Sequence, residues 1–197
     1  NIFAHGKFIS ILSKNKLKTY DGKGVLISDV DANVSVPLAH TSGNYMVLAE
    51  KNGDSLYLIS GGSILWDTKV EGTISGVNVN DNGYVSAIIK NTIYKSVIIL
   101  YDLSGNELFR RYVSSNYAIC TDVSKDNKYL AVGEIDHSGT ILKSYVKIIS
   151  VDLAATDPKN SIIYTYESEN GEIINNINYQ DKDSAVCMFN SYIQKVM

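Results

Sequence analysis

The chain has 197 residues, of which 45% are hydrophobic and 20% charged, and its formal net charge is −3 at pH 7. This size and hydrophobic content suffice for a globular domain with a substantial core. The acidic balance argues against a nucleic-acid partner, because phosphate binding needs several clustered cations, and we interpret Arg110 and Arg111 as solvated strand positions. No apolar run approaches the roughly 18 residues of a membrane helix, so no membrane insertion is expected within this segment.

The chain repeats one pattern five times: a short strand, a polar turn, an anchor residue and an apolar strand. The copy from Val77 to Asn91 shows it clearly, with Asp81 in the turn and Tyr84 as the anchor. The anchors, in chain order, are Phe8, Tyr45, Tyr84, Tyr129 and about Ser184. Their spacing of roughly 40 to 55 residues is typical of propeller blades and not of helical repeats.

Each anchor strand is followed by a second apolar run, a turn and a third run. In the third copy this predicts a β-hairpin over Val97–Tyr112 that turns at Ser104–Asn106. The fourth copy has a longer connection, Ala154–Asn160, and only around Ala154 and Ala155 do we expect a helical turn. Elsewhere β-branched and aromatic residues dominate, and turns interrupt the runs every 8 to 12 residues or so, which argues against a helical fold.

Three segments resemble the repeats of a known group of proteins. Ser124–Val132 resembles the strand-turn-strand signature of WD40-like and TolB-like bacterial β-propeller repeats, and Asn80–Tyr84 is similar to it. Tyr101–Asn106 looks like the strand end and turn that close such a blade. The resemblance implies an all-β, propeller-like fold of three- to four-stranded antiparallel blades, with an incomplete ring as one outcome.

The chain also departs from the pattern of those repeats. Lys125 stands where proline is usual, Asn127 stands where glycine is usual, and the single Trp-Asp pair, Trp66-Asp67, lies in a different strand. The composition, rich in asparagine, lysine, isoleucine and tyrosine, is similar to that of uncharacterised surface-anchored propeller domains of Gram-positive bacteria. That similarity favours an extracytoplasmic, cell-surface location, tethered by a segment outside this chain.

A single repeat domain is expected over residues 1–197. The expected division is a partial repeat 1–33, repeats 34–72, 73–115 and 116–170, and a partial repeat 171–197. Propellers close with four to eight blades or so, and the larger numbers are common. Together with a start at Asn1 in place of methionine, this favours a processed product or an excerpt of a larger propeller. The alternative, in which the terminal pieces combine into one shared blade, stays open.

Metal and cofactor chemistry has little support in the sequence. Glu134, Asp136 and His137 lie together, but no second histidine cluster completes a metal shell, so we interpret them as a polar loop leaving a strand. His5 and His40 are isolated before turns and are expected to hydrogen-bond them. No metal site and no cofactor is expected.

Two stretches resemble a calcium loop: the first has its alternating oxygen ligands and its glycine, and the second has half of that pattern. They are Asn78, Asn80 and Asn82 with Gly83, and Asp29 and Asp31 with Asn33. The twelfth position of such a loop needs a bidentate acidic residue, and those places hold Ile89 and His40. Both stretches are therefore interpreted as strand-turn junctions.

The two cysteines, Cys120 and Cys187, are too few and too far apart for a zinc cluster, and each lies in an apolar run typical of a buried strand. A disulfide between them stays open as an alternative. Neither cysteine adjoins a plausible base and no nucleophile elbow is present, so no catalytic residue is assigned.

The fourteen tyrosines are the remaining signal. The anchor tyrosines are expected to pack between blades, with their hydroxyl groups at the edge. Others lie near strand ends and loops, where tyrosine commonly anchors protein or sugar ligands. They are Tyr94, Tyr112, Tyr117, Tyr145 and Tyr192.

The sequence favours a non-catalytic binding or scaffolding domain that presents loops to a protein or cell-envelope ligand, with the binding residues unassigned. Two alternatives remain open: a propeller hydrolase or lyase with a metal in the channel, and a sensory ectodomain of a membrane-anchored protein.

Overall fold

The computed structural model describes residues 1–169 and 171–196. These residues form nineteen strands in five antiparallel sheets, together with one short α-helix and one 3-10 turn. Within each sheet the strands pair in chain order, as a succession of hairpins requires. The expected all-β fold of three- to four-stranded antiparallel sheets is confirmed.

The strands divide among the sheets as follows. The first sheet contains β1 (Ile2–His5), β2 (Phe8–Ser13), β3 (Lys16–Tyr20) and β4 (Leu26–Asp31). The second contains β5 (Pro37–Ser42), β6 (Tyr45–Glu50), β7 (Ser55–Ser60) and β8 (Ser63–Lys69). The third contains β9 (Thr73–Val79), β10 (Val85–Lys90), β11 (Ser96–Tyr101) and β12 (Glu107–Val113). The fourth contains β13 (Tyr117–Val123), β14 (Tyr129–Asp136), β15 (Lys143–Ser150) and β16 (Ile162–Glu167). The fifth contains β17 (Ile174–Tyr179), β18 (Ala185–Phe189) and β19 (Ile193–Val196).

The hairpin predicted over Val97–Tyr112 is confirmed, since β11 and β12 pair antiparallel. Its turn is held by Asp102, whose Oδ1 accepts hydrogen bonds from the backbone N–H groups of Ser104 at 2.8 Å and Asn106 at 2.9 Å. Gly105 in this turn has φ +84°, a conformation that other residues seldom adopt. The polar residues that interrupt this apolar segment, Asp102–Asn106, therefore form the turn of the hairpin.

The sheets pack face to face, and a separate apolar cluster fills each space between neighbours. In β6, Met46 and Leu48 belong to the cluster shared with the first sheet, whereas Val47 and Ala49 belong to the cluster shared with the third. Because successive side chains of a strand point to opposite faces, a strand that lies between two sheets must be apolar at every position.

The anchor tyrosines lie in these spaces. Tyr45 packs against the cluster between the second and third sheets, Tyr84 against the one between the third and fourth, and Tyr129 against the one between the fourth and fifth. Their predicted packing between blades is confirmed.

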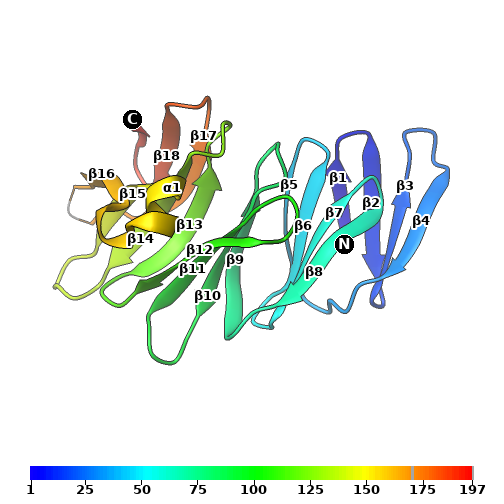
Figure 1. The fold of residues 1–197 in the computed structure, drawn as a ribbon, viewed down its shortest axis with the longest axis horizontal. Coiled ribbons are helices and arrows are strands. Elements are labelled where there is room, and N and C mark those ends of the chain that lie inside the picture. Colours follow the sequence, from blue (N-terminus) through cyan, green and yellow to red (C-terminus); the bar gives the residue numbers. More distant parts are fainter. Residues whose placement is uncertain (170, 197) are drawn as a thin grey trace.

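The sheets follow one another across the molecule, from the first sheet at the right of Figure 1 to the fourth and fifth sheets, which overlap at the left. The first strands of successive sheets, β1, β5, β9, β13 and β17, contact one another in chain order and form the inner edge of this arc. Within the described residues no ladder of hydrogen bonds joins the first sheet to the last, so the ring is not closed. The sheets show where the strands lie, but they do not define at which residue one repeat ends and the next begins. The repeat boundaries given above therefore remain a prediction.

The long connection of the fourth sheet contains α1 (Val151–Thr156) and the 3-10 turn η1 (Pro158–Asn160), which confirms the expected helical turn. Ser150 caps α1, because its side chain accepts a hydrogen bond from the backbone N–H of Leu153. The helix packs against β12 of the preceding sheet, with Ala154 buried in the cluster that the two sheets share.

Candidate functional site

The polar segment Glu134–His137 does not converge on one point. Glu134 is buried, and its Oε2 accepts hydrogen bonds from Asn116 Nδ2 at 2.9 Å and Lys147 Nζ at 2.5 Å. Asp136 turns outward and accepts a hydrogen bond from the backbone N–H of Ser138, while the His137 ring packs against Tyr117. Among the described residues, no group of three or more His, Cys, Asp or Glu side chains could hold a metal ion.

The asparagines that resemble part of a calcium loop join two equivalent turns instead. Asn80 Oδ1 accepts hydrogen bonds from the backbone N–H groups of Asn82 and Tyr84, both at 3.0 Å. The side-chain amide groups of Asn80 and Asn82 both donate to Asn127 Oδ1, at 2.7 and 3.0 Å. In the other stretch, Asp29 and Asp31 form ion pairs with neighbouring lysines on β3.

The two cysteines are free thiols, so the disulfide alternative is not formed in this structure. Both lie in the apolar space between the fourth and fifth sheets, Cys120 on β13 and Cys187 on β18. Burial raises the pKa of each thiol to about 12, which keeps both protonated and unreactive at neutral pH.

A row of polar side chains follows the inner edge of the arc. Each member lies opposite, in the neighbouring strand, the residue two positions after an anchor. The members are His40, Asn78, Asp122 and Asn178. His40 Nδ1 accepts a hydrogen bond from the backbone N–H of Val79, and Asp122 Oδ2 accepts one from the backbone N–H of Tyr179. The cavities beside this row have volumes of only about 100 and 120 Å³. The row therefore serves mainly to tie neighbouring inner strands together.

Burial changes the protonation of several groups at this edge and at the first sheet. It raises the pKa of Asp122 to about 6 and lowers the pKa values of His5 and His40. His5 Nε2 lies 2.9 Å from Ser10 Oγ, and its Nδ1 lies 3.4 Å from the backbone oxygen of Asn44 in the turn of the next sheet.

Aromatic side chains gather at one end of the third and fourth sheets, and all of them except the half-buried Tyr94 are exposed. Two connections, β10–β11 and β12–β13, and the end of β14 bring them together there. We call this group the loop-face cluster, and its members are Ile93, Tyr94, Lys95, Tyr112, Tyr117 and His137.

The side chains of the loop-face cluster hold one another in place. The Tyr94 and Tyr112 rings lie 4.6 Å apart between centroids, and the Tyr117 and His137 rings lie 5.0 Å apart. Lys95 Nζ lies 5.4 Å from the Tyr117 ring centroid, and it donates a hydrogen bond to the backbone oxygen of Ser115 at 2.6 Å.

The same cluster remains open to solvent. Ile93 is 79% exposed, Tyr112 51% and Tyr117 41%. A shallow cavity of about 340 Å³ lies among Lys90–Lys95 and Tyr117. This combination of exposed apolar area and fixed ring positions suits a contact surface better than a site for bond chemistry.

The sequence identified only part of this cluster. Tyr94, Tyr112 and Tyr117 were expected near strand ends, and the structure brings all three together. The sequence analysis missed Ile93 and Lys95. Their position next to Tyr94, in the connection between β10 and β11, could have indicated them. Tyr145 lies within β15, and Tyr192 stacks on Phe189 at 4.7 Å, so neither belongs to the cluster.

Comparison with solved structures supports the propeller architecture. The β-propeller domain of Cps50 (Swd1) from Myceliophteria thermophila aligns with a TM-score of 0.64 at 13% identity, over 99% of this chain and 68% of that one. Hsv2 from Kluyveromyces lactis aligns with a TM-score of 0.62 at 14% identity, over 100% of this chain and 72% of that one. The Dos1 propeller aligns with a TM-score of 0.62 at 14% identity, over 91% of this chain and 49% of that one. At these identities the similarity concerns the fold alone, and it confirms a propeller-like arrangement of the sheets.

The comparison with curated proteins gives no match. No helix among residues 1–169 and 171–196 is long and apolar enough to cross a membrane. A family model matches residues 3–195, nearly the whole chain, and is described as a family of unknown function. The chain therefore belongs to the DUF5711 family.

Proposed function

We propose that the chain is a non-catalytic binding domain that docks a protein ligand on the loop-face cluster. The observation that carries this proposal is that the exposed side chains of Ile93, Tyr112 and Tyr117 lie together at one end of two stacked sheets. Exposed tyrosines with fixed rings provide large contact areas at a low cost in side-chain entropy, which is why tyrosine is enriched at the centres of protein interfaces.

The arrangement of the rings favours a protein over a cell-envelope sugar. A sugar stacks on the flat face of an aromatic ring. In this cluster Tyr94 and Tyr112 pack against each other, and the Tyr117 ring is flanked by Lys95 and His137. Ring edges, hydroxyl groups and the exposed Ile93 side chain remain available, and these suit the mixed apolar and polar contacts of a protein ligand.

Panning of a phage-displayed random peptide library against the domain tests this proposal. We expect enriched peptides to shift the backbone amide NMR signals of residues 91–95 and 112–117. Tyr117→Ala should weaken their binding about tenfold or more, which corresponds to the loss of roughly 1.4 kcal/mol or more of interface energy. Tyr164→Ala is the matched control, because Tyr164 is 37% exposed on β16, outside the cluster.

Two results would overturn the proposal: peptides whose signals map to another surface, or equal losses for the two variants. A parallel titration with soluble cell-wall glycan fragments covers the cell-envelope alternative. Shifts at the cluster with glycan and none with peptides would reassign the ligand class.

A further inference from the structure

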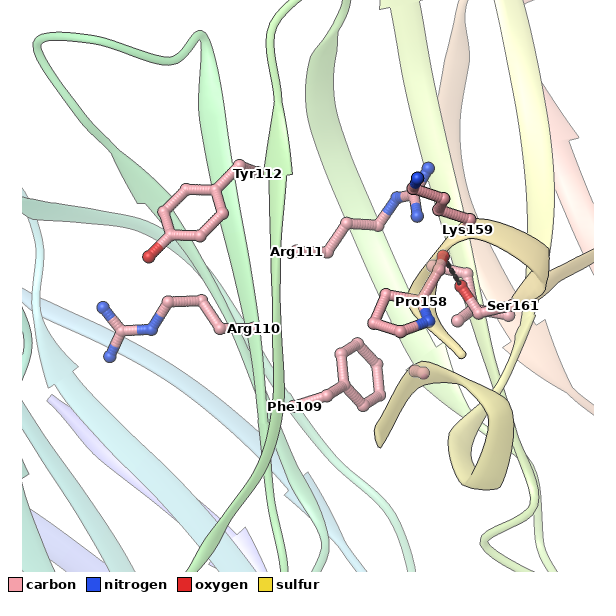
Figure 2. Close-up of a pocket in the computed structure, with 9 residues that line it drawn as sticks. Phe109, Arg110, Arg111, Tyr112, Pro158, Lys159 and Ser161 are labelled. Atoms are coloured by element: carbon pink, nitrogen blue, oxygen red, sulfur yellow. Dashed lines mark hydrogen bonds between the residues drawn. The ribbon is translucent and has the colours of Figure 1, made fainter. Parts of the chain in front are cut away.

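A second concave site lies at the outer rim, between β12 of the third sheet and the α1–η1 connection of the fourth (Figure 2). We call it the rim groove. Its volume is about 250 Å³, and Phe109, Ile149, Ala154 and Pro158 supply its apolar surface. Because typical pockets for drug-sized ligands measure about 300 to 1,000 Å³, the groove suits a compact group of about the size of one amino-acid side chain.

Two cationic side chains, Arg111 and Lys159, line the groove together with these apolar residues. Figure 2 shows Arg111 extending from β12 toward η1. Arg111 is half-buried and not a solvated strand position as the sequence suggested. Its Nε is buried and has no hydrogen-bond partner among the described residues.

Neither cation has an anionic partner within the part of the chain that the structure describes. Arg111 and Lys159 form no ion pair there, and no carboxylate lines the groove. The neighbouring Arg110 behaves differently: it points to the opposite side of β12 in Figure 2 and pairs with Glu107 at 2.8 Å. Two like charges that line one small groove repel each other, and an anion bound in the groove would relieve this repulsion.

We infer that the rim groove binds a carboxylate carried by a compact apolar group. The planar guanidinium of Arg111 matches a carboxylate in geometry, and Lys159 adds a second positive charge. The apolar surface formed by Phe109 and Pro158 receives the body of the ligand. Such a ligand could be the C-terminal residue of a peptide chain or a free small carboxylic acid. Tyr112 lines this groove and also belongs to the loop-face cluster. The inference does not rest on the loop-face proposal, because Phe109, Pro158 and both cations lie outside that cluster.

NMR titration of the whole domain with three small compounds that carry the same apolar side chain tests the inference. N-acetyl-L-leucine represents a peptide terminus, 4-methylpentanoate represents a free acid, and N-acetyl-L-leucinamide is the uncharged control. At least one acid should shift the amide signals of residues 109–111 and 153–161, and the amide should not. The acid that binds more tightly identifies the source of the carboxylate.

Charge-removing variants complete the test. Arg111→Gln and Lys159→Gln should each weaken binding of the acid about tenfold, as expected for a lost hydrogen bond between charged groups. Lys159 is exposed, so its variant keeps the test decisive even if the Arg111 variant unfolds. Lys23→Gln makes the same charge change at a remote exposed turn and should leave binding unchanged.

Three results would overturn the inference. The first is equal binding of the leucinamide and the acids. The second is an equal loss for Lys23→Gln. The third is equal binding of inorganic phosphate, since phosphate carries no apolar body.

Discussion

The carboxylate of Asp122 on β13 accepts a hydrogen bond at 2.6 Å from the backbone N–H of Tyr179 on β17. The bond joins two inner strands that belong to different sheets and therefore share no ladder of backbone hydrogen bonds. Asp122 is 6% exposed and also accepts a hydrogen bond from the backbone N–H of Val123. The ionised carboxylate of Asp122 is therefore only weakly stabilised by water.

Asp122 should make stability depend on pH. Burial raises the pKa of this carboxyl from 3.8 to about 6, so the folded state binds the proton more tightly than the unfolded state. Its stabilising contribution is therefore complete below about pH 4 and is lost as pH rises through about 6, by up to about 3 kcal/mol.

Other carboxyl groups titrate in the same range, so the contribution must be measured as a difference. Urea unfolding of the native protein and of Asp122→Asn at several pH values gives this difference. The free energy of unfolding of the native protein, minus that of the variant, should fall between pH 4 and pH 7 or so. A difference that stays constant or increases over this range would contradict the prediction.

A second contact between sheets is made at the turn of the β11–β12 hairpin. A Cβ atom at Gly105 would lie 2.9 Å from Cγ of Trp66, which belongs to the second sheet. Trp66 Nε1 also donates a hydrogen bond to the backbone oxygen of Leu103 in this turn. Gly105→Ala should therefore destabilise the fold by about 2 to 4 kcal/mol, through both backbone strain and displacement of the indole ring.

Gly24→Ala is the matched control for this prediction. Gly24 has φ +81°, close to the +84° of Gly105, but a Cβ there would meet no atom within 4 Å. Its variant should cost only the backbone strain, about 1 to 2 kcal/mol. Equal losses in thermal or urea unfolding would mean that the Trp66 contact contributes nothing.

The repeated turns made the architecture predictable from the sequence. Anchors such as Tyr45, Tyr84 and Tyr129 recur at fixed places after polar turns, and the strands that follow them are apolar at nearly every position. Both patterns depend on local chemistry: the turn needs asparagine, aspartate or glycine, and a strand packed on both faces cannot alternate with polar residues.

The sites were harder to predict, because they depend on how one sheet is placed against the next. The sequence indicated a helical turn around Ala154, but not that it would pack on β12 and bring Lys159 to the same groove as Arg111. Likewise, Tyr94 and Tyr117 come from different sheets and line the same cavity only because those sheets stack on each other. The inner row is hard to recognise for another reason: its equivalent positions hold different residue types, with histidine at 40, aspartate at 122 and asparagine at 78 and 178.

The repeat alignment itself can be tested by mutation. Tyr129 packs against the cluster between the fourth and fifth sheets, so Tyr129→Ala should lower the free energy of unfolding by about 3 to 5 kcal/mol. Lys125→Ala, in the turn four residues earlier, should change it by no more than about 0.5 kcal/mol. Similar values for both variants would contradict the placement of Tyr129 as an anchor between sheets.

The final prediction concerns the buried ion pair of the fourth sheet. Glu134 and Lys147 have side chains that are 1% and 17% exposed, and Asn116 donates a further hydrogen bond to Glu134. Lys147→Met alone leaves a buried carboxylate without its cation and should cost about 3 to 5 kcal/mol. Combining it with Glu134→Gln removes the charge and keeps an acceptor for Asn116, so the double variant should recover at least half of that loss. Urea unfolding of the native protein, the two single variants and the double variant gives the coupling energy directly. A double variant that is as unstable as Lys147→Met would show that the loss arises from packing and not from the unpaired charge.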